Sequence, residues 1–282
     1  MSDKKPRDDL SERDKQDAGA RSAPSASVVF EAIRSQAQEE LDRPNDALFW
    51  SGLAAGLSMG FSFIAETLLH SAVPESSWQP LVTKFGYTVG FLIVILGRQQ
   101  LFTENTLTPV LQVLHEQRVS VALHTLRLWG IVLGANLLGT GLFALALHLG
   151  EPFDPATVAT LEKVAEHALE GEFWGIMFRA VFAGWLIALM VWLLPFAETA
   201  RVTVIIIITY LIGIGGFPHV IAGSAEAFYA ALVGVESWSA AVLHFLVPTL
   251  IGNVIGGVAL VAALNYAQVA PDDEDGGRQR DL

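Results

Sequence analysis

Two apolar segments of this chain are each broken near their middle, one by GRQQLFTENT (residues 97–106) and the other by GGFPH (residues 215–219). Apolar sequence resumes directly after each break. The hydrocarbon of a bilayer offers no hydrogen-bond partners, so broken backbone at membrane depth is stable only inside protein or beside a water-filled path. A pair of such breaks in the two halves of a chain is typical of a transport site.

The composition places the chain among proteins that cross a membrane several times. Of its 282 residues, 52% are hydrophobic and 16% are charged, and the mean hydropathy is +0.46. The net charge of −12 argues against nucleic-acid binding, which needs clustered lysine and arginine. The sequence contains no metal-ligand cluster, phosphate loop or catalytic constellation, so we expect no cofactor, no metal site and no enzymatic activity.

The chain divides into four regions. Residues 1–25 are polar and are expected to be disordered in the cytoplasm, and residues 26–45 carry apolar positions at helical spacing, which predicts a cytoplasmic amphipathic helix. Residues 46–268 form the membrane domain, and residues 269–282 form a polar cytoplasmic tail. We expect six membrane passages, the second and fifth of them broken. They lie near residues 46–70, 80–116, 121–149, 172–195, 201–233 and 237–268.

The order of the passages also indicates their arrangement. Each half of the chain has three passages with the broken one second, and an odd number per half makes the two repeats inverted relative to each other. Lysine and arginine concentrate in the N-terminal region and in loops on the same side, which predicts that both termini are cytoplasmic. The loop after the third passage begins with Asp154 and Pro155, a helix N-cap and first-turn pair that predicts a short surface helix.

His219, in the second break, is the strongest candidate for a functional residue. An ionisable group inside a membrane is costly and marks a functional pathway by default. Imidazole titrates near neutrality, so it can lend or accept a proton while an anion passes. The alternative is a neutral histidine that bonds a backbone carbonyl freed by the break.

The first break offers a different set of side chains. Leu101 and Phe102 form an apolar rim beside the hydroxyl of Thr103, which suits a constriction that sheds water. We expect Arg98 and Glu104 to form an ion pair, because lone charges at this depth are costly. Such a pair would hold the loop together without excluding a role in gating.

Two lone amides, Asn136 and Asn253, lie in apolar helices of the third and sixth passages. Amides inside membranes usually bond a neighbouring helix or a freed carbonyl. A structural role is therefore favoured over direct contact with a substrate for both.

Three motifs of this chain resemble those of the formate/nitrite transporter family, and they are LFTENT (101–106), GFPHVIA (216–222) and LIGNVIGG (250–257). Their order and spacing match across about residues 45–268, and the first break looks most like that of the YfdC-type branch of inner-membrane proteins. The resemblance implies an all-α, aquaporin-like fold of six spans with two broken helices. It also implies a homopentamer in the bacterial inner membrane.

The family resemblance further implies a pore in each protomer for a small monovalent anion such as formate or nitrite, or its conjugate weak acid, together with protons. Two apolar constrictions would flank a central histidine that protonates or polarises the anion. Pro218 and Gly223 depart from the family, which usually has an acidic residue before the histidine and an asparagine four residues after it. Carried over by motif, the pore or substrate residues are Leu101, Phe102, Thr103, Phe217, His219 and Asn253.

Two other functions are compatible with the sequence. A channel with Pro218 and Gly223 could pass water or a neutral weak acid without protonating anything. A non-conducting assembly could instead anchor a partner at the N-terminal segment, with Arg98 and Glu104 plugging the route. We favour an anion channel or proton-coupled anion transporter, because neutralising a small acid removes its large desolvation cost.

Overall fold

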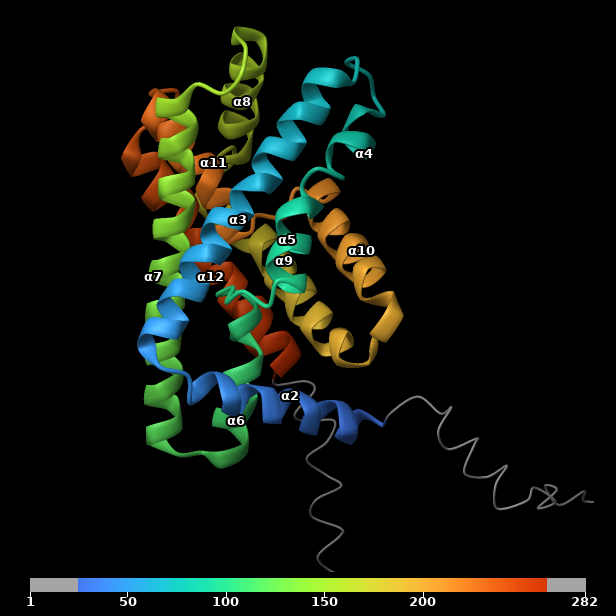
Figure 1. Cartoon of the computed structure of the whole chain (residues 1–282), viewed down its shortest axis with the longest axis vertical. Coiled ribbons are helices and arrows are strands. Elements are labelled where there is room, and N and C mark those ends of the chain that lie inside the picture. The colour runs from blue at the N-terminus through green and yellow to red at the C-terminus, as the bar shows by residue number, and fades with distance from the viewer. Residues whose placement is uncertain (1–24, 263–282) are drawn as a thin grey trace, which may run out of the picture.

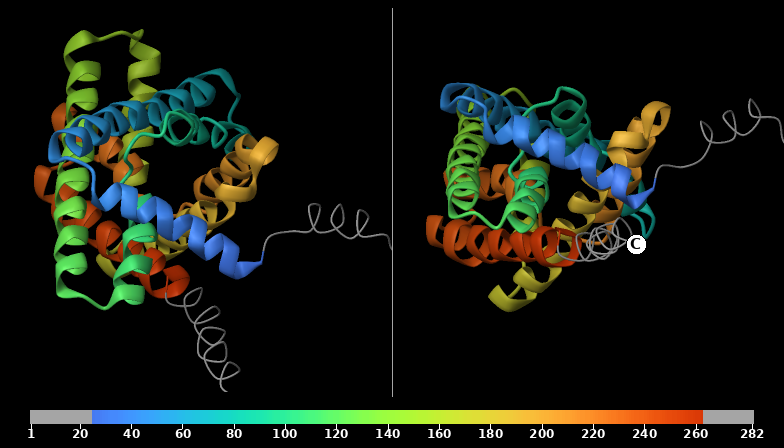
Figure 2. Two further views of the ribbon diagram at one scale, coloured as in Figure 1. Left: turned by 60° about the horizontal axis from the view of Figure 1, so that its bottom comes forward. Right: turned by 90° about the horizontal axis from the view of Figure 1, so that it is seen from below.

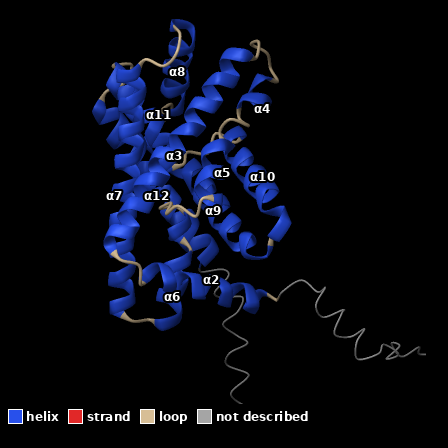
Figure 3. Cartoon of the chain, in the orientation of Figure 1, coloured by secondary structure: helices blue, strands red, loops and turns tan. Residues whose placement is uncertain are grey.

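The structure is a computed structural model that describes residues 25–262. Within that range every regular element is a helix and no strand is present (Figure 3). Residues 1–24 and 263–282 lie outside the description. The predicted disordered N-terminus and polar tail therefore fall outside the described residues.

Long apolar helices form the unbroken passages. They are α3 (Asn45–Ala72), α7 (Val119–Gly150), α9 (Phe173–Leu193) and a last helix in which α12 (Val247–Ile255) lies between two π-helical stretches, Ala240–Leu246 and Gly256–Ala262. Each is long and apolar enough to cross a bilayer. In Figure 1, α3 packs along α7, and α12 packs along α9.

The second and fifth passages are broken, as predicted. In the second, α4 (Gln79–Thr83) and α5 (Thr88–Leu96) lead into a loop with one 3-10 turn (Glu104–Thr106), and α6 (Thr108–Glu116) follows. In the fifth, α10 (Arg201–Ile214) and α11 (Val220–Val233) flank the second break. Helices α10 and α11 have 14 residues each and α6 has 9, fewer than the ~20 residues that a span requires.

The local sequence explains where these half-helices end. Gly216 has a φ of +57°, in the left-handed region that glycine adopts without steric cost. Pro218 has no amide hydrogen to donate and disfavours helical backbone at the residue before it. In the first break, Arg98 occupies the left-handed region with a φ of 51° directly after Gly97, the C-cap of α5. Each helix therefore stops at a residue that turns the chain.

An asparagine from the neighbouring long helix holds the first break. Asn136 of α7 donates from Nδ2 to the carbonyl of Gly52 (2.7 Å) and to that of Gln100 (2.9 Å). Its Oδ1 accepts the backbone N–H of Phe102 at 2.9 Å. These bonds satisfy backbone groups of the loop that lipid could not, so the asparagine clamps the loop on both sides of Leu101.

The second break is held in the same way. Asn253 of α12 donates to the carbonyls of Ala180 (2.8 Å) and Pro218 (3.0 Å), and its Oδ1 accepts the N–H of Val220 at 2.9 Å. The clamp therefore brackets His219, as the clamp of Asn136 brackets Leu101. This correspondence agrees with the inverted three-helix repeats predicted from the sequence, and the structural role favoured for both amides is the one observed.

Two amphipathic helices cover opposite ends of the bundle (Figures 1 and 2). Helix α2 (Ala26–Leu41) packs on α6 and buries Phe30 and Ile33. Helix α8 (Pro155–Ala168) packs on α11 and α3. The predicted N-cap is confirmed, because the Asp154 carboxylate accepts the N–H groups of Ala156 (2.9 Å) and Thr157 (3.1 Å). These bonds, with that from the Thr157 hydroxyl, lower the pKa of Asp154.

Candidate functional site

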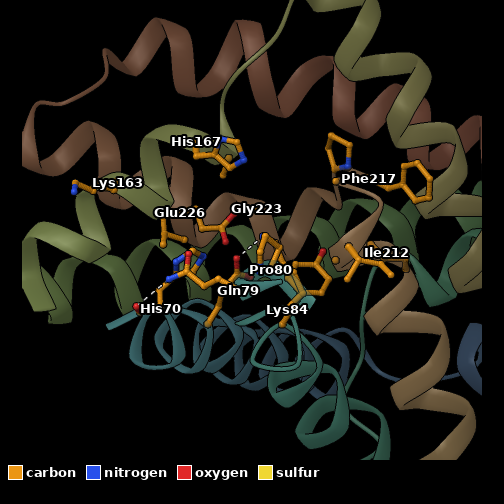
Figure 4. A pocket seen from close by; sticks show the side chains of 18 of the residues that line it. His70, Gln79, Pro80, Lys84, Lys163, His167, Ile212, Phe217, Gly223 and Glu226 are labelled. Atoms are coloured by element: carbon orange, nitrogen blue, oxygen red, sulfur yellow. Dashed lines mark hydrogen bonds and ion pairs between the residues drawn. The ribbon is translucent and has the colours of Figure 1, made fainter. Parts of the chain in front are cut away.

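Two cavities enter the bundle from its opposite ends. The first, which we call the α8-side vestibule, has a volume of about 920 Å³ (Figure 4). Its lining includes exposed Glu75 and buried His219. The second, the α2-side vestibule, has a volume of about 720 Å³ and runs from exposed Glu39 to buried Asn105. Their lining comes from helices of both repeats. The second break lines the inner end of the α8-side vestibule, and the first break lines that of the α2-side vestibule.

A thin buried layer separates the vestibules. Leu101, Phe102 and Thr103 are at most 2% exposed and line neither cavity. The neighbouring residues Gln100 and Asn105 line the α2-side vestibule. The first-break loop therefore faces one cavity with its amides and presents its apolar and hydroxyl residues to the middle of the bundle.

His219 and Thr103 meet in this layer. The Nε2 atom of His219 lies 2.7 Å from Oγ1 of Thr103, and both side chains are buried. Nδ1 of His219 accepts the backbone N–H of Ala222 at 3.2 Å, so the imidazole caps α11. Because Nδ1 is an acceptor, the ring proton is on Nε2, and Nε2–H donates to Thr103. Two residues that the sequence singled out separately are thus in direct contact, and the histidine is a neutral donor.

Phe91 completes the surroundings of the imidazole and was not identified from the sequence. Its ring meets the ring of His219 edge-on, with centroids 5.0 Å apart, and the phenylalanine is fully buried. Nothing in the α5 sequence distinguishes Phe91 from a residue of the apolar core. By contrast, the predicted Phe217 lines the α8-side vestibule and stacks on Phe182 at 5.3 Å.

The other predicted pore residues have separate positions. Leu101 is fully buried between the backbone groups that Asn136 clamps. The ring of Phe102 packs edge-on against Trp129 of α7, with centroids 5.7 Å apart. The amide of Asn253 is fully engaged with backbone groups, which leaves it a positioning role for His219.

The predicted ion pair between Arg98 and Glu104 is not formed. Ion pairs among the described residues include Lys84 with Glu66 and Arg34 with Glu31, but not this one. Arg98 is exposed and Glu104 is half-buried, and both line the α2-side vestibule. The cavity gives each charge access to solvent, so neither needs the other as a partner.

Helix α2 closes one side of the α2-side vestibule. Its Glu40 is buried and accepts a hydrogen bond from Oγ1 of Thr108 (2.9 Å), the first residue of α6. A second bond comes from Nε2 of Gln36 at 3.0 Å. Burial raises the pKa of Glu40 in spite of these bonds. This carboxyl group ties α2 to the start of the helix that follows the first break.

Sequence reasoning also missed a charged cluster in the α8-side vestibule. Glu66 and Lys84 form an ion pair there. Glu226 also lines this cavity (Figure 4), as does His219. One signal was available for Glu226, because it follows His219 by seven residues and so lies on the same face of α11. Glu66 and Lys84 are 18 positions apart, and their spacing carries no such signal.

Comparison with known proteins agrees with this architecture. The family model for formate/nitrite transporters matches residues 27–267. The chain is 40% identical to the inner membrane protein YfdC of Escherichia coli over 247 residues, which are 88% of this chain and 80% of that protein. It is 25% identical to the formate channel FocA of Haemophilus influenzae over 243 residues, which are 76% of this chain and 83% of that protein.

Two solved structures share the fold. One is a pentameric formate channel with formate bound, with a TM-score of 0.71 and 18% identity over 80% of this chain and 98% of that one. The other is an FNT family ion channel, with a TM-score of 0.75 and 20% identity over 86% of this chain and 99% of that one.

Proposed function

Because the chain belongs to the formate/nitrite transporter family, we propose that each protomer conducts a small monovalent weak-acid anion, of the formate or nitrite class, past His219. The observation that carries the proposal is the pair of vestibules from opposite ends, one of which reaches His219 while the other reaches Gln100 and Asn105, on either side of residues 101–103. The two cavities provide aqueous access, and the buried layer between them limits what crosses. Relatives named as formate channels support the choice of substrate class.

The buried layer between the vestibules imposes a desolvation cost on any solute that crosses it. A bare anion cannot enter an apolar layer built from Phe91 and Leu101 without losing its hydration, whereas a neutral acid loses far less. Nε2–H of His219 is a hydrogen-bond donor within this layer, and its present acceptor is the hydroxyl of Thr103. A substrate oxygen that replaces this acceptor is held within the layer by a hydrogen bond from Nε2–H. His219 then orients the substrate, and Thr103 accepts the hydrogen bond of the imidazole when no substrate is bound.

The neutral-solute alternative has one observation in its favour. Nδ1 of His219 already accepts a backbone N–H, so protonating the ring would break the cap of α11. A pre-formed neutral acid would need no such step. The non-conducting alternative relied on a plug formed by Arg98 and Glu104, and that pair is not formed.

The same proposal includes location and assembly. Arg43, Arg98 and Arg201 line the α2-side vestibule, which by the positive-inside rule is cytoplasmic, as are both termini. The inner-membrane relative supports a bacterial inner membrane, and the pentameric structural neighbour supports a homopentamer. Cross-linking in native membranes and the mass of the detergent-solubilised complex test the assembly.

The decisive experiment is flux into proteoliposomes at two pH values, with formate, nitrite and glycerol as test solutes. We expect formate and nitrite flux to rise as the pH falls, and His219→Ala to abolish it while the oligomer persists. His219→Asn is the matched control, since asparagine is a good N-cap and lacks the Nε2 donor. Equal flux and pH profile in all three proteins would remove His219 from the mechanism. Glycerol entry insensitive to pH, without anion flux, would favour the neutral-solute channel.

A further inference from the structure

The α8-side vestibule contains a built charged site distinct from the pair of His219 and Thr103. Glu66 of α3 and Glu226 of α11 are both buried, at 1% and 8% exposure, and both line the cavity. Lys84, just after α4, contacts Oε1 of Glu66 as an ion pair. Glu226 lines the same cavity from α11, which packs against α3. Two buried carboxyl groups thus line this cavity together with Lys84.

The backbone fixes the ion pair in place. Oγ of Ser62, one turn before Glu66 on α3, donates to the carbonyl of Tyr87 at 2.6 Å and accepts the N–H of Gly90 at 3.0 Å. A Cβ at Gly86 would lie 2.3 Å from the backbone nitrogen of Glu66. The loop that carries Lys84 is therefore fastened directly against α3 at Glu66.

One carboxyl group in this site is in excess. Oε2 of Glu66 is buried and has no hydrogen-bond partner. Glu226 has neither a hydrogen bond nor an ion pair to any residue that the structure describes. Ionised carboxylates in such surroundings are costly unless each is paired. A single lysine can neutralise one of the two, so the second requires another positive charge or a proton.

Among the described residues, none of the other charged groups that line the vestibule forms a hydrogen bond or ion pair with Glu66 or Glu226. Lys163 and His167 are exposed on α8, and His167 pairs with Glu170. Arg179 of α9 donates to the backbone carbonyls of Gly216 and Glu170. His70 is one turn beyond Glu66 on α3 and is half-buried. Glu75 at the mouth is acidic, and Tyr87 is a buried neutral phenol.

The position of Glu226 connects this site with His219. His219, Gly223 and Glu226 are spaced i, i+4 and i+7, so they follow one face of α11 along the vestibule wall. Glu226 lies about 10 Å from His219 along the helix axis, at 1.5 Å per residue. Gly223 puts no side chain of its own on the wall between them.

We propose that Glu66 and Glu226 share one exchangeable proton beside Lys84, and that this site supplies the proton to the anion that enters the channel. The inference rests on the proposed function and names its proton source. With the proton bound, the three groups are neutral. Without it they carry a net charge of −1, which repels an incoming anion from a narrow cavity.

The transfer step balances. The carboxyl O–H bond breaks, and the proton forms a new O–H bond on the anion, which becomes a neutral weak acid. The carboxylate left behind is stabilised by Lys84. A hydronium ion that enters through the open mouth of the vestibule then returns a proton to the pair and leaves as water. His219 keeps its cap on α11 throughout, which removes the need to protonate its Nδ1.

Infrared difference spectroscopy of the full-length protein in nanodiscs tests the shared proton directly. We expect the carbonyl band of a protonated carboxyl group at neutral pH, and we expect Glu226→Gln and Glu66→Gln each to shift or remove it. Glu166→Gln is the matched control, because Glu166 is exposed on α8 and does not line the vestibule. The charge-balanced double variant Glu66→Gln/Lys84→Met covers the case in which Glu66→Gln alone disrupts assembly. A band unchanged in both single variants and the double variant would overturn the proposal.

Formate flux into proteoliposomes tests the use of that proton. We expect Glu226→Gln to lower flux at neutral pH about tenfold and to flatten its pH profile, as loss of a general acid should, while Glu166→Gln behaves as wild type. A band that disappears while flux and pH profile stay unchanged would rule out delivery of this proton to the substrate. If the wild type carries no formate at all, the proposed function fails, and the infrared band still decides whether the proton is shared.

Discussion

The two breaks share one backbone design but have opposite central residues. In each, an asparagine from the last helix of its repeat clamps the carbonyl before and the N–H after one residue. That residue is Leu101 in the first break and His219 in the second. The same backbone arrangement therefore occurs in both repeats, but the side chain at its centre differs. One repeat contributes an apolar side chain to the layer between the vestibules, and the other contributes an imidazole.

The two breaks also differ in the residues and helices that surround them. The second break opens into the larger vestibule, which also contains Glu66, Lys84 and Glu226. The first break is covered by α2 through Glu40. The two repeats thus differ in the bracketed residue and in what covers it, while the same asparagine clamp satisfies the backbone groups of both breaks.

The largest expected effect is loss of a clamp. Asn136→Ala and Asn253→Ala each remove three hydrogen bonds and leave buried backbone groups unsatisfied, at about 1–3 kcal/mol for each group. We expect each variant to lose roughly 3–9 kcal/mol of unfolding free energy by that measure, seen in denaturant unfolding of the detergent-solubilised protein. Similar losses in both would support equivalent clamps. A clamp that can be removed without loss of stability in one repeat would break the comparison.

A smaller effect is expected at the helix contacts that support the clamps. A Cβ at Gly56 would lie 2.2 Å from the carbonyl oxygen of Asn136, and a Cβ at Gly184 would lie 2.1 Å from that of Asn253. We expect Gly56→Ala and Gly184→Ala to destabilise the protein by about 1–3 kcal/mol each through overpacking. Thermal unfolding measures this.

Gly134 of α7 provides the control for these substitutions. It has open space where a Cβ would be added. Gly134→Ala should leave the protein as stable as wild type or raise its stability by up to about 1 kcal/mol through helix propensity. If Gly134→Ala destabilised the protein as much as Gly184→Ala, close packing would not be the cause.

The next prediction concerns the hydrogen bond between Thr103 and His219, which has no counterpart at the matching position of the other break. Thr103 lies two residues after Leu101, and Ile221 holds the same place after His219. Thr103→Val removes the acceptor of His219 Nε2–H, a bond worth about 1 kcal/mol, so we expect formate flux to fall about five- to tenfold. Thr103→Ser should restore flux. Ile221→Val, the matched change in the other repeat, should leave flux near wild type, and equal losses at both positions would argue for packing instead.

The smallest effect concerns α2, which covers only the first break. Burial raises the pKa of Glu40 above its ordinary value of 4.5. A raised pKa means that the folded protein holds this proton more tightly than the unfolded chain, so stability is highest at low pH. It falls as the pH rises from the ordinary value through the folded value.

Glu40→Gln should flatten this dependence by less than about 1 kcal/mol. Comparing the melting temperatures of wild type and variant at pH 5 and pH 8 measures the change. A wild type that becomes more stable relative to Glu40→Gln as the pH rises would contradict the sign.

The sequence by itself determined the fold class, the two breaks and the candidacy of His219 and Thr103. Glycine, proline and polar residues that cluster inside an apolar run have local consequences, as Gly216 and Pro218 show by ending a helix through their own backbone preferences. The N-cap at Asp154 was predictable for the same reason. His219 could be identified from the sequence alone because an ionisable residue inside an apolar membrane segment is costly and therefore rare.

The tertiary structure alone decided which groups meet. Nothing local shows that Asn136 and Asn253 bracket Leu101 and His219, or that Lys84 pairs with Glu66 while Arg98 leaves Glu104 unpaired. The expected pair of Arg98 and Glu104 assumed a charge sealed in apolar surroundings, and the vestibule relieves that constraint. Helix crossings set these contacts, and residues far apart in sequence come within bonding distance only once the two repeats pack against each other.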